Sequence, residues 1–490
     1  MVHIQWASQQ TLFHRVQRSE VFGHSISGSL STPVPRALLI KEPSNASNGL
    51  KFNDPLFKEQ WYLDEAASEE FLYLNSEFKA IPENSHGTYC AAIAAGVANN
   101  RVCGVGVAYD AKIVGVRILN GPLTDAQEAI ALVHALEVVD IYTASWGPED
   151  KGNAIGGPGH LARKAILKGV TQGRRGKGAI YVWAAGNGGA YLDNCNLDGY
   201  ASSPFTVTVG ALGPEGRSAF YSEHCAAVLA SVYVGGPHYP PSKEDLEKER
   251  QKPKVVVPEG RGKCRQTFQG TSAAAPLAAG AIALLLQANP SLGWRDVQHI
   301  ILNTCRIPSP EEHGWLWNAA GFHFHPKIGC GALDVDRMVE SAIHWKPVGR
   351  LKTWKSAPVK SKKLLLARRN TFLVTNVNKS SMHPINKINR LETVVATVDI
   401  TNLHCGHLEM SLTSPMGTRS AILTRRPYDN KTTRFPHWDF TSLHFWGEDP
   451  EGKWLFEVSN HGYENGFLNY FSVTFYGTEE KEHQPQPRKH

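Results

Sequence analysis

Three residue types that together can transfer an acyl group occur in short motifs rich in small residues. Ser272 precedes an apolar run at 277–287 that predicts a helix, so its hydroxyl is expected at the helix N-terminus, among unpaired backbone N–H groups. His86 precedes a second helical run, and Asn187 follows an apolar strand-like run in a glycine-rich turn. These residues supply a nucleophile, a general base and an oxyanion donor. Each alone could be structural, as a helix cap, a packed histidine or a turn residue, but the combination favours acyl-transfer chemistry.

Six motifs resemble one enzyme family. They read NSHGT, WAAGNGG, GTSAAAP, ASWGPED, CNLDGY and VCGVGVA. The first three resemble the His, Asn and Ser blocks of the subtilisin-like serine proteases, and the others narrow the resemblance to the kexin/furin-like proprotein convertases. The resemblance implies a calcium-dependent serine endopeptidase that processes secretory precursor proteins after paired basic residues, Arg-x-x-Arg or Lys-Arg. Ser272 is then the nucleophile, His86 the general base and Asn187 the oxyanion donor.

The resemblance also implies acids that bind the substrate. Asp150 and Asp198 match the residues that hold the arginine just before the scissile bond. Glu128, with Tyr200 beside it, matches the holder of the arginine three residues further upstream. A cationic side chain needs such carboxylates because an unpaired charge in a pocket is costly. Two further acids complete the candidate set: Asp125 and Glu83.

Two calcium sites are implied by the same resemblance, since calcium takes several carboxylate or carbonyl oxygens. One would lie behind the arginine pocket and would use Asp150, Asp193 and Glu223. The other would combine side-chain oxygens with backbone carbonyls, from Asp54, Asn100, Val97, Val102 and Gly104.

The sequence departs from the family pattern in two places. Gly156 stands where the family usually has an aspartate, which should weaken the upstream arginine pocket. The family also has a strand ending in a catalytic Asp-Asp-Gly block ahead of the His motif, and no such block occurs between Leu63 and His86. The third triad member, one calcium ligand and one pocket acid are therefore missing, and the context of Asp64 does not resemble the motif.

On triad precedent, loss of the aspartate costs roughly 10⁴-fold in rate. Two interpretations follow. The chain is a mis-assembled or alternatively spliced version of an active convertase, or it is a catalytically dead pseudoprotease that binds basic peptides without cleaving them.

Composition is that of a globular protein. The chain has 490 residues, 42% of them hydrophobic and 20% charged, and a net charge of +6. Nucleic acid binding is unsupported, because the basic residues lack an accompanying fold motif. No apolar run reaches the length of a membrane span, and the N-terminus lacks a signal peptide. We expect a monomer whose partners are precursor proteins with dibasic sites.

The eight cysteines lack the CxxC spacing of a zinc or redox site. In the family resembled, the matching positions imply the disulfides Cys103–Cys264 and Cys195–Cys225 and a free thiol at Cys90. Three cysteines are left unassigned: Cys305, Cys330 and Cys405. Disulfides imply an oxidising compartment. Three glycosylation sequons, at Asn45, Asn378 and Asn430, agree with passage through the secretory pathway, to the Golgi, secretory vesicles or the extracellular space.

Changes in composition divide the chain into six segments. They are a propeptide remnant (1–18), a flexible leader (19–53), the catalytic domain (54–345, lacking the aspartate segment between 63 and 86), a basic linker (346–369), a P domain (370–478) and a disordered tail (479–490). Arg15-Val16-Gln17-Arg18 resembles the self-cleavage site of a convertase propeptide, which implies autocleavage after Arg18 and inhibition by the propeptide. The chain thus resembles a version truncated within its propeptide.

The predicted fold is α/β, a subtilisin-like parallel sheet flanked by helices, followed by an all-β sandwich. Strands are predicted at Ile113–Leu119, Ile141–Ser145, Ala179–Trp183 and Phe205–Val209. Helices are predicted at Leu123–Val139 and His160–Val170, and residues 237–263 predict an inserted surface loop. Active residues in such folds come from the carboxyl ends of strands and the adjoining helix starts, which is where the three motifs fall.

Overall fold

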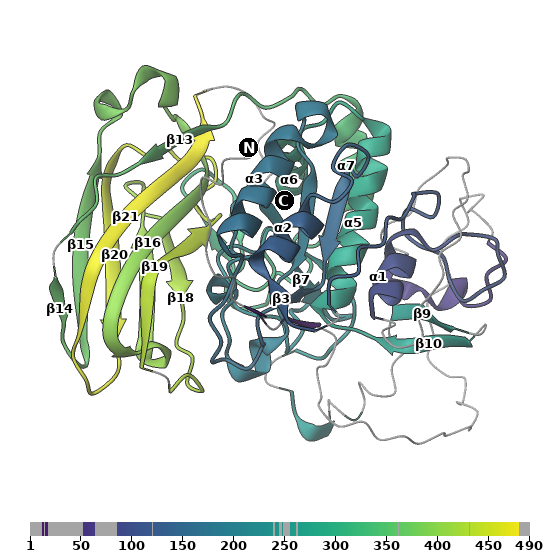
Figure 1. The fold of residues 1–490 in the computed structure, drawn as a ribbon, viewed down its shortest axis with the longest axis horizontal. Coiled ribbons are helices and arrows are strands. Elements are labelled where there is room, and N and C mark those ends of the chain that lie inside the picture. Colours follow the sequence, from purple (N-terminus) through teal and green to yellow (C-terminus); the bar gives the residue numbers. More distant parts are fainter. Residues whose placement is uncertain are drawn as a thin grey trace, which may run out of the picture.

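The computed structural model describes residues 12–13, 15–17, 52–63, 86–119, 121–238, 241–244, 247, 255–260, 263–360, 362–430 and 432–479. Figure 1 shows two parts side by side, a domain of helices around a sheet and a domain built mainly from strands. The predicted α/β domain followed by a β-sandwich is therefore confirmed. Nearly all of the predicted leader and tail lies outside the described residues.

A parallel four-stranded sheet forms the centre of the first domain. Its order is β4-β6-β7-β8, with bounds Ile141–Ala144, Ile180–Ala184, Thr206–Leu212 and Ala230–Tyr233. The register pairs Ile141 with Ile180 and Tyr181 with Thr206. Every residue of β6 and β7 is buried, as expected for a parallel sheet covered on both faces.

Helices cover both faces of this sheet. Helix α5 (Thr271–Ala288) packs across all four strands, together with α1 (His86–Ala95), α6 (Trp294–Thr304) and α7 (Val335–Ile343). Helices α2 (Asp125–Leu132) and α3 (His160–Gln172) cover the other face. Alternation along β6 explains the two layers, since Val182 joins the core on the α5 side and Trp183 the core on the α3 side. Although α5 is the one described helix long and apolar enough to cross a membrane, 78% of it is buried inside this domain.

Three predicted elements differ in the structure. Residues 113–119 form no strand, and Val114 and Val116 are exposed, because no described strand pairs with their backbone. Helix α2 ends at Leu132 instead of Val139, and Ala135 takes a φ of 52°, which interrupts a right-handed helix. The predicted loop 237–263 contains β9 (Val255–Gly260), which pairs antiparallel with β10 (Lys263–Phe268).

Two antiparallel sheets form the second domain. The first contains β13 (Lys352–Lys355), β14 (Lys363–Leu365), β16 (Arg390–His404), β19 (Thr432–Ser442) and β21 (Gly466–Thr478). The second contains β15 (Arg369–Val377), β17 (Leu408–Thr413), β18 (Arg419–Leu423) and β20 (Gly452–Asn460). Their inner faces meet in a core that includes Trp454, Phe456 and Phe475. The segment read as a basic linker, 346–369, is thus largely part of the sandwich, because β13 and β14 both pair with β21.

Short elements complete the chain. The short strands are β1 (Leu12–Phe13), β2 (Val16–Gln17), β3 (Leu123–Thr124), β5 (Trp146–Gly147), β11 (Leu316–Trp317) and β12 (His323–Phe324). The 3₁₀ turns are Phe57–Glu59, Trp61–Leu63, Gly173–Gly176, Gly188–Tyr191, Cys195–Leu197, Lys379–Ser381, Pro384–Asn386 and Cys405–His407.

Disulfides connect distant parts of the first domain. Both implied pairs, Cys103–Cys264 and Cys195–Cys225, are present. A third pair, Cys305–Cys330, joins two of the cysteines that sequence reasoning left unassigned. Cys90 and Cys405 are buried and take part in none of these disulfides.

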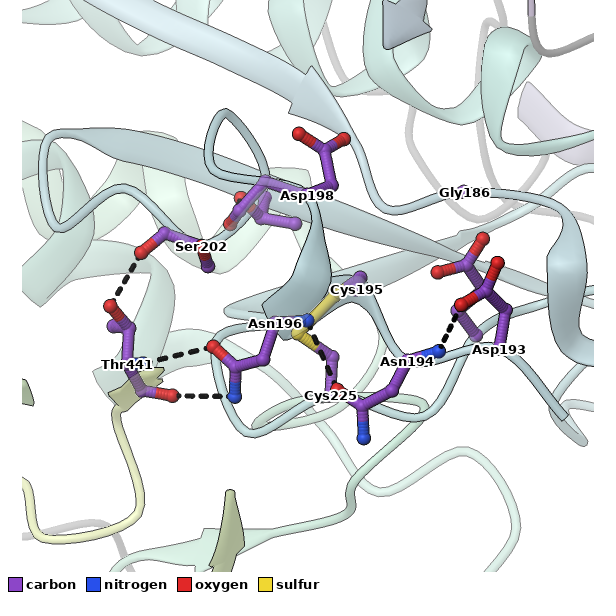
Figure 2. The surroundings of a disulfide bond; sticks show 12 residues. Gly186, Asp193, Asn194, Cys195, Asn196, Asp198, Ser202, Cys225 and Thr441 are labelled. Carbon is purple, nitrogen blue, oxygen red and sulfur yellow. Dashed lines mark hydrogen bonds between the residues drawn. A yellow bond between two sulfur atoms is a disulfide. The ribbon is translucent and has the colours of Figure 1, made fainter. Parts of the chain in front are cut away.

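Buried polar residues join the two domains. The Asn196 side-chain amide donates to the carbonyls of Ile422 (2.9 Å) and Thr441 (3.0 Å) and accepts from the Thr441 N–H (2.9 Å), beside the Cys195–Cys225 disulfide (Figure 2). At a second point Arg295 Nε donates to Glu392 (2.8 Å). Burial alone would raise the pKa of Glu392, but His299 and Arg295 lower it to about 2. The carboxylate is therefore charged and paired within the interface.

Candidate functional site

Ser272 and Asn187 meet at the N-terminus of α5. Ser272 is the second residue of α5 and is fully buried, and Gly270 before it takes a φ of 97°, which favours glycine. The Asn187 carbonyl oxygen accepts from both the N–H and the hydroxyl of Thr271, each at 2.9 Å. This contact fixes the amide orientation and leaves the Asn187 Nδ2 group without a hydrogen-bond partner, as is also the case for Ser272 Oγ. A buried hydroxyl and a buried amide donor thus share one helix terminus.

His86 is the first residue of α1, and only 8% of its surface is exposed. Its Nε2 atom has no hydrogen-bond partner, and its Nδ1 atom lies 3.9 Å from Cys90 Sγ. The Cys90 thiol donates to the backbone carbonyl of Ser272 at 3.5 Å, so α1 packs on the start of α5, although His86 Nε2 and Ser272 Oγ form no hydrogen bond with each other. Burial lowers the pKa of His86 to about 4. Within the described residues no carboxylate pairs with this imidazole.

Arg15 occupies a pocket formed by the predicted upstream-arginine residues. Its Nε donates to Glu128 at 2.7 Å, and its Nη2 donates to the Tyr200 hydroxyl at 3.0 Å and the Gly157 carbonyl at 3.2 Å. The side chains of Arg15 and Glu128 are 4% and 0% exposed, so this ion pair is shielded from water. The Tyr200 hydroxyl also donates to Glu128 at 2.5 Å. Burial raises the pKa of Tyr200, which keeps the phenol protonated as a donor.

Backbone pairing holds the rest of the Arg15 segment. Leu12–Phe13 pairs antiparallel with β3, and Val16–Gln17 pairs antiparallel with β5, with Gln17 opposite Trp146. Strand pairing on both sides of a buried arginine is how an extended peptide adds to a sheet edge, with affinity from the main chain and specificity from the side-chain pocket.

The acids predicted for the other arginine lie on two loops. Asp150 accepts from the Asn187 N–H at 2.9 Å, and Asp198, 5% exposed, accepts from the Tyr200 N–H at 2.8 Å. Figure 2 shows Asp198 on the loop that the Cys195–Cys225 disulfide closes. The Asn196 contacts attach this loop to the second domain, so the sandwich supports the position of Asp198 and Tyr200.

Three other predicted positions differ or are not described. Asp125 accepts from the N–H groups of Leu161 (2.8 Å) and Ala162 (2.9 Å), so these hydrogen bonds attach it to the start of α3. Its carboxylate stabilises that helix terminus. Glu83 and Arg18 lie outside the described residues.

The first implied calcium site is only partly assembled. Calcium takes oxygen donors, and Asp150, Asp193 and Glu223 all gather around the turn at Gly188, where an added Cβ would meet Glu223 Oε1 at 3.0 Å and the Asp150 carbonyl at 3.1 Å. Asp193, however, accepts from Arg426 Nη1 at 3.1 Å and from two backbone N–H groups. Among the described residues, no group of three or more His, Cys, Asp or Glu side chains is placed to hold a metal ion. As arranged, these residues do not complete a calcium site.

The second implied calcium site has a similar outcome. Asp54 is buried, and its carboxylate accepts from the N–H groups of Asn99 (2.6 Å) and Asn100 (3.2 Å). The Asn100 side-chain oxygen accepts from the Val102 N–H at 2.8 Å. These bonds stabilise the loop that also carries the other implied ligands, Val97 and Gly104, and among the described residues no metal-binding group of three or more His, Cys, Asp or Glu side chains includes Asp54.

Sequence reasoning missed three contacts of the site. Ser145 Oγ donates to the Ser272 carbonyl at 3.0 Å, the Gly157 carbonyl contacts Arg15, and Arg426 of the sandwich is completely buried against Asp193. Ser145 lies within a recognised motif, but nothing in its spacing indicates the partner. Arg426 carries no sequence signal, because its partner is more than two hundred residues away.

Known proteins resemble this chain in both sequence and structure. Residues 48–331 match the Subtilase family, and residues 391–475 match the Proprotein convertase P-domain. A PC3-like endoprotease variant B from Hydra vulgaris is 42% identical over 392 residues, which is 80% of this chain and 54% of that protein. Proprotein convertase subtilisin/kexin type 4 from Homo sapiens is 37% identical over 501 residues, covering 97% of this chain and 64% of that protein. The chain thus spans between about half and two thirds of the length of these relatives.

The crystal structure of a serine protease from Aeromonas sobria matches with a TM-score of 0.70 at 19% identity, covering 90% of this chain and all of that one, which supports the fold alone. The serine at the start of α5, the histidine at the start of α1 and the sandwich that follows thus occur in a sequence whose first domain matches one family over more than half of the chain. The chain belongs to the subtilase family and carries a proprotein convertase P-domain.

Proposed function

We propose that this chain is a serine endopeptidase that cleaves secretory precursor proteins on the carboxyl side of arginine in Arg-x-x-Arg sequences. The observation that carries the proposal is the burial of Arg15 against Glu128 and Tyr200. A buried carboxylate with further oxygen acceptors beside it selects the planar donor set of a guanidinium over a neutral side chain, because either charge alone would be costly to bury. Three residues after Arg15 the sequence reaches Arg18, the expected cleavage position.

The acyl-transfer step uses the residues at the start of α1 and α5. His86 Nε2 accepts the proton of Ser272 Oγ as the oxygen attacks the carbonyl carbon after the second arginine. Asn187 Nδ2 donates to the oxyanion that forms, and the N-terminal position of Ser272 on α5 adds a favourable dipole. His86 then returns the proton to the leaving amine, and water hydrolyses the acyl-enzyme by the same route. Support comes from the two buried polar atoms, Ser272 Oγ and Asn187 Nδ2, that have no protein partner.

The arginine next to the scissile bond is assigned to Asp150 and Asp198. Both carboxylates accept backbone N–H bonds that hold them in place, and Asp198 is buried. The segment around Arg15 competes for the same surface, so the chain's own N-terminal segment acts as an inhibitor until it is cut. The three disulfides support folding in an oxidising compartment, in agreement with the secretory pathway.

Calcium is proposed as a structural ligand that takes no part in the reaction. It would bind at Asp150, Asp193 and Glu223 and would have to replace the pairing of Asp193 with Arg426. Thermal unfolding with calcium and with a chelator tests this: an increase in Tm that the Glu223→Gln variant loses supports the site, and equal Tm values reject it.

Self-processing is the direct test of the enzyme. Intact-mass measurement of the purified chain should show removal of residues 1–18 in the wild type and an intact N-terminus in Ser272→Ala. An Arg-x-x-Arg fluorogenic peptide should be cleaved by the wild type only. A wild-type chain that binds this peptide by fluorescence anisotropy, yet neither processes itself nor cleaves the peptide, would overturn the proposal.

A further inference from the structure

Cys90 contacts both residues to which we assign proton transfer. It follows His86 by four residues on α1, so the two side chains lie one above the other on the same helix face. Its sulfur lies 3.9 Å from His86 Nδ1 and 3.5 Å from the Ser272 carbonyl oxygen. The thiol therefore contacts Nδ1 of the His86 ring. The other ring nitrogen, Nε2, has no hydrogen-bond partner.

The single hydrogen of the thiol determines the direction of these contacts. Cys90 is the donor to the Ser272 carbonyl, which has no hydrogen of its own to give. When the thiol hydrogen points to this carbonyl, the sulfur accepts from His86, and the hydrogen between Cys90 and His86 belongs to Nδ1. The neutral imidazole then carries no hydrogen on Nε2, which keeps the lone pair that a general base needs.

Burial keeps the thiol in this role. Burial raises the pKa of Cys90 to about 12, so its hydrogen is retained across the neutral range. The Ser272 carbonyl also accepts from Ser145 Oγ at 3.0 Å, which fixes the position of the acceptor. A neutral thiol can select a tautomer, but it cannot stabilise an imidazolium as a carboxylate does.

We propose that Cys90 is a positioning residue that holds His86 in its Nδ1–H tautomer, so that Nε2 can accept the Ser272 proton. The expected effect on kcat rests on the proposed function, whereas the expected tautomer of His86 does not. In a catalytic triad the partner of Nδ1–H both selects the tautomer and stabilises the charged ring, and Cys90 performs only the first of these tasks.

The tautomer of His86 can be determined by NMR, even if the protein has no enzymatic activity. Spectra of the protein labelled with ¹⁵N-histidine, with the signal of His86 assigned through His86→Ala, distinguish a protonated from an unprotonated Nδ1. The wild type and Cys90→Ser should show the Nδ1–H form, because a hydroxyl can also donate to the Ser272 carbonyl while accepting from the imidazole. Cys90→Ala should shift the population toward Nε2–H, and Cys405→Ala, which removes a buried thiol of the other domain, should change nothing. An unchanged His86 spectrum in Cys90→Ala would overturn the inference.

Kinetics separate positioning from packing. Cys90→Ala should lower kcat by roughly three- to tenfold with KM unchanged, the worth of one hydrogen bond. Cys90→Ser should retain activity and Cys90→Val should lose it. If Cys90 only filled space in the core, Cys90→Val would be the more active of the two variants. If the wild type is inactive while the tautomer shift occurs, the proposed function fails and the positioning role stands. A Cys90→Val variant as active as the wild type would reject the positioning role.

Discussion

Arg15 and His86 are both buried basic side chains, yet their surroundings differ. Arg15 contacts a carboxylate, a phenol and a backbone carbonyl, so its charge is fully compensated. His86 contacts a thiol and an aromatic edge, that of Phe268, and burial lowers its pKa to about 4. One region is built to bind a cation, and the other keeps a base neutral. The difference is therefore one of charge compensation: the buried guanidinium has a carboxylate partner, whereas the buried imidazole has none among the described residues.

The largest expected effect concerns the oxyanion donor. Asn187→Leu removes the free Nδ2 group and should reduce kcat by roughly 10²–10³-fold with little change in KM. Steady-state kinetics on the fluorogenic peptide check this, with Asn376→Leu on the exposed surface of β15 as the control. Equal kcat values for Asn187→Leu and the wild type would remove Asn187 from the mechanism.

Next in size is the arginine pocket. Glu128→Gln keeps the shape of the side chain but removes the charge opposite Arg15, so the preference for upstream arginine over alanine should fall roughly 10- to 100-fold. Ratios of kcat/KM for the two peptides measure it. Glu137→Gln, at an exposed position, is the matched control. Unchanged selectivity in Glu128→Gln would contradict the pocket assignment.

The domain contact supports the pocket and should be visible in stability. Asn196→Ala leaves Thr441 and Ile422 with unpaired buried backbone groups and should reduce the free energy of unfolding by about 2 kcal/mol. Urea unfolding followed separately by a probe in each domain is the measurement, since two domains need not unfold together. No loss of stability would indicate that water replaces these bonds.

The smallest expected effect is a shift of the acid limb of the kcat/KM profile to lower pH. Because burial lowers the pKa of His86 to about 4, its neutral form persists at mild acidity, and the acid limb of kcat/KM should lie near pH 4 instead of 6.5. The unfolded chain takes up this proton near pH 6.5, so His86 makes the fold less stable as the pH falls from 6.5 to 4. Activity is therefore compared only where fluorescence shows a folded protein. An acid limb at or above 6.5 would indicate a charged partner of His86.

Local patterns were sufficient for much of the fold. The apolar runs around β4, β6 and β7 and the helical runs at α3 and α5 lie where the sequence predicts them, because each element satisfies its own periodicity. The apolar run at 113–119 also predicts a strand, but the structure has none there. A strand requires a neighbour to pair with, and its own sequence cannot supply one.

Residue types and motifs by themselves determined the family resemblance and the helix-terminal places of Ser272 and His86, and the resemblance in turn implied two of the three disulfides. Only the tertiary structure decided which groups meet: Arg15 with Glu128, Arg426 with Asp193, Cys90 with both His86 and Ser272, and Cys305 with Cys330. The physical reason is the sequence separation over which each interaction acts. Periodicity and capping act over a few residues, whereas burial of a charge or a thiol depends on partners that the fold brings from distant segments.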